Sequence, residues 1–471
     1  MVGLLNPFSA VALSAAHFAL AAGVTLHVLA HNRNSGSAIA WIGLAWLSPV
    51  FGSVLYLLLG INRVRRRAKD YARPQPDALA IQPAPSNSPD DHLAPLERAA
   101  FQISQRPVEA GNSVTLLHNG DQAYPDMLAA IDAATTSVGL SSYIFRTDIV
   151  GNRFIEALKR ARDRGVEIRV LIDGYGGGYL RSSAYRALNR AGIRVARFMH
   201  SAWPWRMPFL NLRTHRKILV VDGCVAFMGG LNIGAENLVN SRPRHPVIDT
   251  HFRVAGPVVA QLCDSFAEQW YFATGEILAG TVWFPVLEAV GDSDARAVTS
   301  GPNQDLEKIE LLTLAAIGCA RSSIQIMTPY FLPDDRLITA LALAAMRGID
   351  VDIVLPEHSN HPTVDWAMRA QIGPLLSAGC RVWTHAPPFD HSKLMAIDAI
   401  WCFVGSSNWD MRSFRLNFEI NLEIYRAAVV RQVAATIAAK RATRFASADL
   451  ARRPLALRLR DNAARLMLPY L

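Results

Sequence analysis

Residues 215–222 have the sequence HRKILVVD, and residues 391–398 have the sequence HSKLMAID. Both segments follow the pattern H-x-K-x4-D. Each is followed by a second shared feature, because MGGLN ends at Asn232 and VGSSN ends at Asn408, each 17 positions after its histidine. A single such motif by chance has odds of about 1% in a chain of this length, and two in the same register are far rarer. The pattern therefore indicates a duplicated functional unit, whose shared polar residues are His215, Lys217, Asp222 and Asn232 in the first copy and His391, Lys393, Asp398 and Asn408 in the second.

The sequence around the motifs repeats as well. RDRGVEIRVLID (162–173) corresponds to AMRGIDVDIVLP (345–356), and RAGIRVARF (190–198) corresponds to SAGCRVWTH (377–385). In both copies a helical pattern ends at a glycine and a strand rich in β-branched residues follows, which is typical of α/β units. We expect an α/β fold with two repeats, 111–285 and 286–450, forming one bilobal catalytic unit.

The paired residues suit chemistry on a phosphate group. Imidazole acts as a nucleophile or proton donor near neutral pH, and lysine and asparagine can donate hydrogen bonds to phosphate oxygens. If each H-x-K lies on a strand, both side chains share one face. Two halves folded face to face would place His215 and His391 on opposite sides of one phosphorus atom, so that one attacks while the other protonates the leaving group. We expect no metal and no cofactor, since the sequence has no H-E-x-x-H motif or Cys/His cluster.

The roles of the carboxylates are left open by the sequence. We group Asp222 and Asp398 with His215, Lys217, His391 and Lys393 as the candidate catalytic residues. Each aspartate either orients a catalytic residue or ends a strand in a turn. Glu236 and Glu419 follow the two motifs and are expected either to orient the histidines or to be ordinary surface carboxylates. We group Glu236 and Glu419 with Asn232 and Asn408 as the candidate substrate-binding residues.

The N-terminal segment predicts a membrane anchor. Residues 10–30 and 39–61 are uncharged apolar runs of about the length that spans a bilayer as a helix, although Pro49 would kink the second. The flank at 61–73 has six basic residues and one acidic residue, which by the positive-inside rule places the rest of the chain in the cytoplasm. We therefore expect a transmembrane hairpin over 1–73, followed by a Pro-rich linker over 74–110.

The net charge of +9 is concentrated at the edges of the catalytic region. Residues 440–471 contain eight basic and two acidic residues, a charge of +6, and the basic flank 61–73 carries +5. Their sum of +11 exceeds the net charge of +9, so the remaining chain carries −2 and is close to neutral. Such a distribution favours an anionic membrane over nucleic acid as the partner. The Arg/Leu-rich segment 451–471 is predicted to form a basic amphipathic tail, lying on lipid or docked on the catalytic body, and the aromatic segment 200–213 is a candidate membrane-dipping loop or a packed loop.

The motifs also resemble a known family. SSNWDMRSFRLNFEINLEIY (406–425), HNGDQAYPDMLAAIDAA (118–134) and RTHRKILVVDG (213–223) are similar to segments of bacterial cardiolipin synthases in the phospholipase D superfamily, and the resemblance covers nearly the full chain. One departure is PVIDTHFRV (246–254), where the family commonly has Trp-Arg before the Asp-Thr pair.

The resemblance implies phosphatidyl transfer at the bacterial inner membrane, with a multi-pass anchor and a cytoplasmic catalytic domain. One phosphatidylglycerol would give its phosphatidyl group to a histidine and release glycerol, and a second would accept it to form cardiolipin. The superfamily pattern makes His215 the nucleophile and His391 the general acid, a choice the symmetric sequence cannot make. A phospholipid hydrolase, a nucleic-acid phosphodiesterase and an inactive scaffold remain as alternatives, and the second substrate and the oligomeric state stay open.

Overall fold

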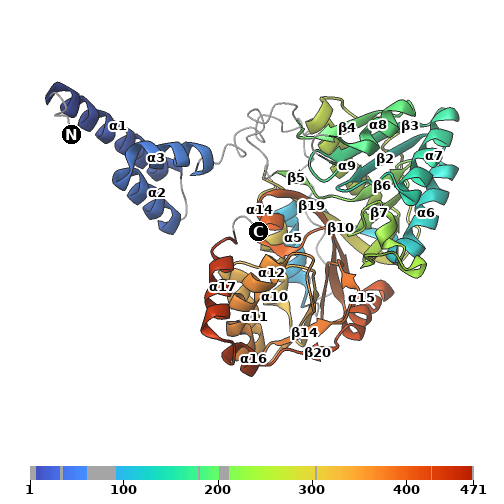
Figure 1. Cartoon of the computed structure of the whole chain (residues 1–471). Helices are drawn as coiled ribbons and strands as arrows, with labels where there is room; N and C mark the ends of the chain where they lie inside the picture. Colours follow the sequence, from blue (N-terminus) through green and yellow to red (C-terminus); the bar gives the residue numbers. More distant parts are fainter. Residues whose placement is uncertain are drawn as a thin grey trace. The chain divides into compact units, whose positions relative to one another are not determined.

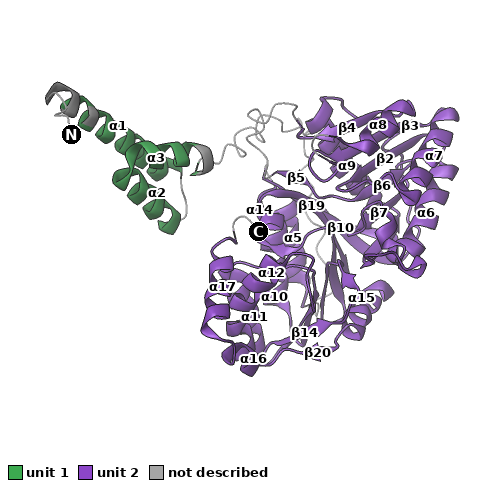
Figure 2. Ribbon diagram, viewed as in Figure 1, with its two compact units in different colours: residues 1–70 green, residues 71–471 purple. Residues whose placement is uncertain are grey.

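The structure is a computed structural model that describes residues 7–31, 35–60, 92–178, 181–200, 212–302, 305–425 and 427–468. It divides into two compact units, residues 1–70 and residues 71–471, which Figure 2 colours separately. The aromatic loop 200–213 and the basic flank 61–73 fall largely or entirely outside the described residues.

The first unit is a small helical hairpin. Its elements are α1 (Pro7–His31), α2 (Ser35–Leu47), α3 (Pro49–Leu55) and the short π-helix η1 (Tyr56–Gly60). The two arms are joined by polar contacts, because His27 Nδ1 lies 2.6 Å from the Tyr56 hydroxyl and the Trp46 indole N–H donates to Thr25 Oγ1 at 3.1 Å. The two apolar runs therefore form helical arms that contact each other, and the transmembrane hairpin stays a prediction.

The second arm differs from the single helix expected over 39–61. It breaks between α2 and α3 at Ser48, because Pro49 has no N–H to donate and fits only at the first turn of a new helix. Among the described residues, one helix is long and apolar enough to cross a bilayer, with its most apolar window at Ser14–His31.

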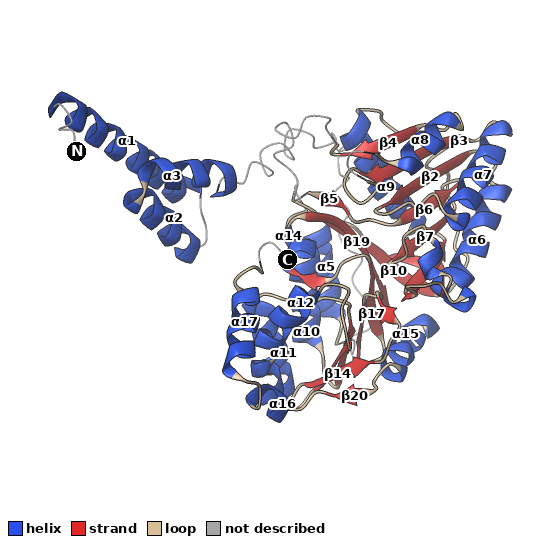
Figure 3. Ribbon diagram, viewed as in Figure 1, coloured by secondary structure: helices blue, strands red, loops and turns tan. Residues whose placement is uncertain are grey.

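The second unit is built on one long mixed sheet with helices on both faces (Figures 1 and 3). Its first half contains the strands β1 (Glu109–His118), β2 (Ser137–Ser142), β3 (Glu167–Asp173), β4 (Val195–Phe198), β5 (Arg213–Thr214), β6 (Ile218–Val221), β7 (Val225–Gly229), β8 (Val247–Ile248) and β9 (Thr250–Ala255). Its helices are α6 (Asn119–Ala133), α7 (Ile149–Asp163), α8 (Ser183–Arg190) and α9 (Val259–Thr274), with short 3₁₀ turns η3 (Ala235–Asn237) and η4 (Val239–Ser241).

The second half repeats this order. Its strands are β10 (Ser293–Ser300), β11 (Ser323–Met327), β12 (Phe331–Leu332), β13 (Asp350–Pro356), β14 (Arg381–His385), β15 (Phe389–Asp390), β16 (Leu394–Ile397), β17 (Trp401–Gly405), β18 (Trp409–Asp410), β19 (Asn417–Tyr425) and β20 (Thr443–Arg444). Its helices are α10 (Lys308–Cys319), α11 (Asp335–Met346), α12 (Pro362–Gln371), α13 (Gly373–Ser377), α14 (Met411–Arg415), α15 (Ala428–Ala439), α16 (Ser447–Ala451) and α17 (Leu455–Arg465).

The halves join edge to edge into a single sheet. The strand order is β20-β14-β13-β11-β16-β17-β19-β10-β1-β9-β7-β6-β2-β3-β4, with β5 paired to β19. The antiparallel pair β1–β10 forms the junction, with Glu109 opposite Ala295. The predicted α/β duplication is therefore confirmed, and its two copies are continuous through backbone hydrogen bonds.

The repeated sequence sets equivalent helix boundaries in both halves. Asp148 caps α7 by accepting hydrogen bonds from Val150 N and Gly151 N, and Asp334 caps α11 in the same way. Gly165 and Gly348 end these helices with φ of +90° and +89°, a conformation that a side chain would strain. The chain then enters β3 and β13, which are buried along nearly their whole length.

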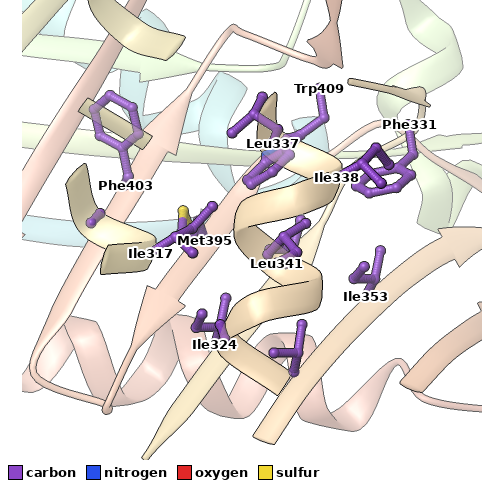
Figure 4. Packing of buried hydrophobic residues seen from close by; sticks show 14 of the residues in the cluster. Ile317, Ile324, Phe331, Leu337, Ile338, Leu341, Ile353, Met395, Phe403 and Trp409 are labelled. Carbon is purple, nitrogen blue, oxygen red and sulfur yellow. The ribbon is translucent and has the colours of Figure 1, made fainter. Parts of the chain in front are cut away.

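Three apolar clusters hold the helices to the sheet. One packs α6, α7 and α8 on the first half, another packs α10 and α11 on the second, and the third places α9 and α15 against strands of both halves. Figure 4 shows the second cluster, in which Leu337, Ile338 and Leu341 of α11 lie over Ile324, Ile353 and Met395 of the sheet.

The linker predicted over 74–110 is wrong from residue 94 onward. Residues Ala94–Ser104 form helix α5, whose Leu96 and Ala100, together with Leu93 just before it, are fully buried in the cluster that contains α10. The proline-rich composition of the preceding segment hid this amphipathic stretch, which gains its stability from burial against a distant helix.

Candidate active site

The two motif histidines face each other between the halves. The centroids of the His215 and His391 rings are 6.4 Å apart, and the rings are nearly perpendicular, at 84°. Both histidines and both lysines immediately precede strands β6 and β16, whereas the sequence had suggested that they lie on the strands themselves. The two rings are therefore close enough for one phosphate group to contact both, as a near-attack arrangement requires.

Each histidine is held by a carboxylate from the opposite half. His215 Nδ1 lies 2.9 Å from Glu419 Oε1, and His391 Nδ1 lies 2.9 Å from Asp249 Oδ2. Both carboxylates are buried, with exposed fractions of 0% for Glu419 and 1% for Asp249. Since the carboxylates occupy Nδ1, the Nε2 atoms are left for the reacting group.

Asp249, and not Glu236, is the structural counterpart of Glu419. In the sheet, Gly229 pairs with His251 and the equivalent Gly405 pairs with Asn421, and each acid lies two residues before that partner. Glu236 instead forms an ion pair with Arg146 at 2.7 Å. The sequence pairing of Glu236 with Glu419 was therefore wrong, while an orienting role for Glu419 agrees with its contact to His215.

The motif lysines are buried beside the histidines. Lys217 Nζ donates to the His215 carbonyl oxygen at 2.8 Å, and Lys393 Nζ makes the same contact to the His391 carbonyl oxygen. Burial lowers the pKa of Lys217 to about 7 and that of Lys393 to about 8. Burial, and then the charge of Lys393, lowers the pKa of His391 to about 4. A phosphate placed here would favour the charged form of both lysines.

The two carboxylates differ in ionisation. Burial raises the pKa of Glu419 to about 7. Burial acts on Asp249 in the same direction, but the hydrogen bond from His391 and the charge of Lys393 together hold the pKa of Asp249 below its usual value. The pair that contains His391 therefore carries the carboxylate better able to stabilise an imidazolium ion.

The two asparagines lie on the wall of the cavity. Asn232 Oδ1 accepts a hydrogen bond from Ile144 N at 3.1 Å, which leaves its amide N–H groups for a ligand. Among the described residues, Asn408 Oδ1 is a buried oxygen without a hydrogen-bond partner. Both side chains line the cavity, and their substrate-binding role stays a prediction.

Asp222 and Asp398 do not reach the cavity. Asp222 accepts hydrogen bonds from the backbone N–H groups of Thr135, Thr136 and Ser137, at 2.8–2.9 Å, at the start of β2. Asp398 does the same for residues 321–323, before β11. The catalytic assignment of the motif aspartates is therefore corrected: they fix the turn after each motif strand to the start of a neighbouring strand, which is the second of the two roles that the sequence left open.

A cavity of about 1100 Å³ opens over the histidine pair. Both halves line it, with Tyr143, Arg213, His215 and Asn232 from the first and Tyr330, His391, Asn408 and Arg412 from the second. The Tyr143 ring lies 5.2 Å from His215, and the Tyr330 ring lies 6.1 Å from His391. In the described part of the chain, no group of three or more His, Cys, Asp or Glu side chains is arranged to hold a metal ion.

Sequence reasoning missed several of these residues. Asp249, Tyr143 and Tyr330 lie outside the H-x-K-x4-D motifs. The sequence did contain a signal for Asp249. If the two repeats are aligned by their strands instead of by the nearest acidic residue, Asp249 occupies the position that is equivalent to Glu419. The segment that departs from the family pattern, PVIDTHFRV, is the one that carries Asp249.

Comparison with known families agrees with this geometry. A family profile described as "Cardiolipin synthase, PLD-like domain" matches residues 127–270 and 313–440, so it matches once in each half. A second profile, "Phospholipase_D-nuclease N-terminal", matches residues 19–60.

Curated relatives extend over nearly the whole chain. A cardiolipin synthase of Geobacillus kaustophilus (strain HTA426) is 32% identical, covering 95% of this chain and 91% of the relative. The major cardiolipin synthase ClsA of Bacillus subtilis (strain 168) is 31% identical, covering 94% of this chain and 95% of the relative. Among solved structures, the phosphatidylserine synthase of Haemophilus influenzae Rd KW20 shares the fold with a TM-score of 0.60 at 14% identity, over 80% of this chain and 100% of that one.

Proposed function

This chain belongs to the cardiolipin synthase family of the phospholipase D superfamily, and we propose that it joins two phosphatidylglycerol molecules into cardiolipin with release of glycerol. As a family member it is a phosphatidyltransferase, and the names of its relatives favour transfer over hydrolysis and over cleavage of nucleic acid. The observation that carries the mechanism is the pair of opposed histidines, each held by a carboxylate from the other half.

The first step forms a phosphohistidine. His215 Nε2 attacks the phosphorus of the donor lipid, the P–O bond to glycerol breaks, and His391 gives its proton to the departing glycerol oxygen. Asp249 supports this assignment, because an ionised carboxylate at Nδ1 stabilises the protonated His391 before the transfer. The superfamily pattern gives His215 the nucleophilic role as well.

In the second step the proton moves in the opposite direction and His215 becomes the leaving group. The hydroxyl of a second phosphatidylglycerol gives its proton to the now neutral His391, its oxygen bonds to phosphorus, and the P–N bond to His215 breaks. Lys217, Lys393, Asn232 and Asn408 stabilise the negative charge that builds on the phosphate oxygens in both steps.

The lipid substrate requires a membrane, and the first unit fits that requirement. We propose that α1 anchors the chain in the bacterial inner membrane and that the basic flank keeps the catalytic halves on the cytoplasmic side. The C-terminal helix α17 packs on α12 with one face and exposes leucine and arginine side chains on the other. On one side, the Arg460 guanidinium lies 4.3 Å from the centroid of the Trp366 ring in α12, and Asp461 is buried.

The other face of the tail is apolar and basic. Leu455, Leu459 and Leu466 are 59–81% exposed, and Arg458 and Arg465 are exposed among them. We propose that this face rests on anionic lipid, which would bring the bilayer near α12, whose Thr363 and Val364 line the cavity.

The test is product analysis with purified full-length protein and phosphatidylglycerol labelled in its acyl chains. Cardiolipin together with free glycerol is expected. Phosphatidic acid alone would instead identify a hydrolase that uses water as the acceptor, and DNA cleavage without lipid turnover would reject the lipid substrate.

Two variants test the histidine pair. His215→Ala and His391→Ala are each expected to lower turnover by at least about 10³-fold, since each removes an obligatory group. His358→Ala is the matched control, because His358 is 74% exposed by its side chain. Turnover retained in either catalytic variant would contradict the two-histidine mechanism.

A further inference from the structure

The segment HNGDQAYP (118–125) joins strand β1 to helix α6 and lies outside both H-x-K-x4-D motifs. His118 pairs with Thr250 at the end of β1, and Asn119 then turns the chain into the helix with φ of +57°. Asparagine adopts this left-handed conformation more readily than most residues. The turn leaves Asn119 beside Asp249, the residue that precedes Thr250.

Asn119 and Asp249 are joined by two hydrogen bonds. Asp249 N donates to Asn119 Oδ1 at 3.1 Å, and Asn119 N donates to the Asp249 carbonyl oxygen at 2.9 Å. Asp249 lies between strands β8 and β9 and belongs to neither, so the Asn119 side chain supplies the acceptor that a strand partner would otherwise supply. Both backbone groups of Asp249 are therefore held by one residue.

The carboxylate of Asp249 has little room to move. Thr250 N donates to its Oδ1 at 2.8 Å, and His391 Nδ1 lies 2.9 Å from its Oδ2. Gly230 packs so closely on the same carboxylate that a Cβ on residue 230 would collide with Oδ1. A shift of the Asp249 backbone would therefore change its hydrogen bond to His391.

The second half holds its orienting carboxylate in a different way. The Glu419 carboxylate itself accepts hydrogen bonds from Ser406 Oγ at 2.6 Å and from Asn417 Nδ2 at 3.2 Å. Within the described residues, His391 is the only side chain that donates to the Asp249 carboxylate. The direction of this carboxylate thus depends on how the backbone of Asp249 is held.

The start of α6 is a rigid base for Asn119. Tyr124, five residues further along, is 1% exposed, and its hydroxyl donates to the Asn232 carbonyl oxygen at 2.8 Å. The Tyr124 ring also packs edge to face on Phe154 of α7, with ring centroids 5.6 Å apart. Side chains that position a reacting group act best from such fixed elements.

We infer that Asn119 is a positioning residue, which holds Asp249 so that its carboxylate stays on Nδ1 of His391 during the proton transfers. This inference rests on the proposed function, because it concerns the general acid of that reaction. Asn119 is not among the described residues that line the cavity, and it acts only through Asp249.

The pH dependence of the reaction reports on this contact. The charged and titratable groups that face His391 are Asp249, Lys217, Lys393, His215 and Tyr330. Burial and then the two lysines lower the pKa of His391, whereas the hydrogen bond and the charge of Asp249 raise it. If the carboxylate turns away, His391 loses its proton at a lower pH, so activity shifts toward lower pH.

The experiment is a double-mutant cycle with full-length protein and phosphatidylglycerol labelled in its headgroup glycerol. Release of labelled glycerol is measured, because this step uses His391 whatever the acceptor is. Asn119→Gly keeps the positive φ and removes only the acceptor for Asp249 N. It is expected to lower kcat about tenfold and to move the pH optimum downward. In an Asp249→Asn background the same substitution should change kcat less than about twofold.

Gln122→Ala is the matched control, because Gln122 Oε1 accepts from His118 N at 2.8 Å in the same turn. Its kcat and pH optimum should equal those of the unchanged protein. Asn119→Asp retains an acceptor and tolerates the same φ, so it should restore most of the activity. An equal fall in kcat for Asn119→Gly with and without Asp249→Asn would overturn the inference. Glycerol release without cardiolipin in the unchanged protein would instead contradict the proposed transfer, and the cycle would still test Asn119.

Discussion

Asp249 is the residue whose role depends most on the assembled structure. Its carboxylate contacts His391 Nδ1 at 2.9 Å, and both this hydrogen bond and its charge raise the pKa of His391 against the effects of burial and Lys393. Removing that charge should make protonated His391 rarer at any given pH. Asp249 is thus a positioning residue that acts through the general acid.

Asp249→Asn is expected to lower kcat about 10²- to 10⁴-fold. Because the pKa of His391 falls further without the carboxylate, the remaining activity should also shift toward lower pH. The measurement is the pH dependence of kcat, with Asp249→Glu as the variant that restores a carboxylate. An unchanged pH profile with reduced kcat would indicate a purely structural role.

For Asp222 we expect that substitution lowers the stability of the fold and leaves catalysis unchanged. Asp222→Ala leaves three backbone N–H groups at the start of β2 without their acceptor, so we expect a loss of about 2 kcal/mol in the free energy of unfolding. The melting temperature of the full-length protein should fall, and the kcat of the folded fraction should be unchanged. Asp398→Ala tests the equivalent turn, and a selective loss of kcat in either variant would restore the catalytic assignment.

At the scale of elements, α17 has two faces with different partners. One face packs on α12 through Arg460 and Trp366, so deleting the helix would disturb the second half as well as any lipid contact. Single substitutions on the exposed face avoid this problem. Leu459 is 59% exposed there, and Leu343 on α11 is a leucine of similar exposure, at 53%, outside the proposed surface.

A fluorescent label at Leu459→Cys is expected to be quenched by lipids that carry quenchers in their acyl chains, in vesicles with anionic lipid. The same label at Leu343→Cys should remain accessible to an aqueous quencher. Both variants are made with Cys224→Ser and Cys319→Ser, because these two cysteines are not fully buried. Equal behaviour of the two labels would reject lipid contact by α17.

Some of these elements could be predicted from the sequence and others could not. The glycines that end helices, the repeated alternation of helix and strand, and the histidine–lysine–asparagine sets could be predicted from local sequence and from the internal duplication. Helix α5 did not, because its burial depends on α10, about 200 residues away along the chain. Asp249 did not either, because its contact to His391 depends on the register of β7 and β9 and on how the halves meet.

At the scale of the whole molecule, the two halves share one sheet, and each half supplies the carboxylate that contacts the histidine of the other half. Glu419 reaches His215 from the second half, and Asp249 reaches His391 from the first. The β1–β10 junction and the β5–β19 pairing fix this exchange within one chain. The site is therefore completed by a single copy of the protein, and neither half alone supplies both a nucleophile and its orienting carboxylate.

Mixing two inactive variants tests this conclusion. His215→Ala and His391→Ala chains, co-expressed and purified together by different affinity tags, should have no more activity than either variant alone. If instead the facing halves of two different copies formed the site, some mixed pairs would unite an intact His215 with an intact His391, and about a quarter to a half of the original activity would return. Because the carboxylate exchange and the sheet junction both lie within one chain, we expect no such recovery, and recovered activity would require that the halves separate and pair between copies.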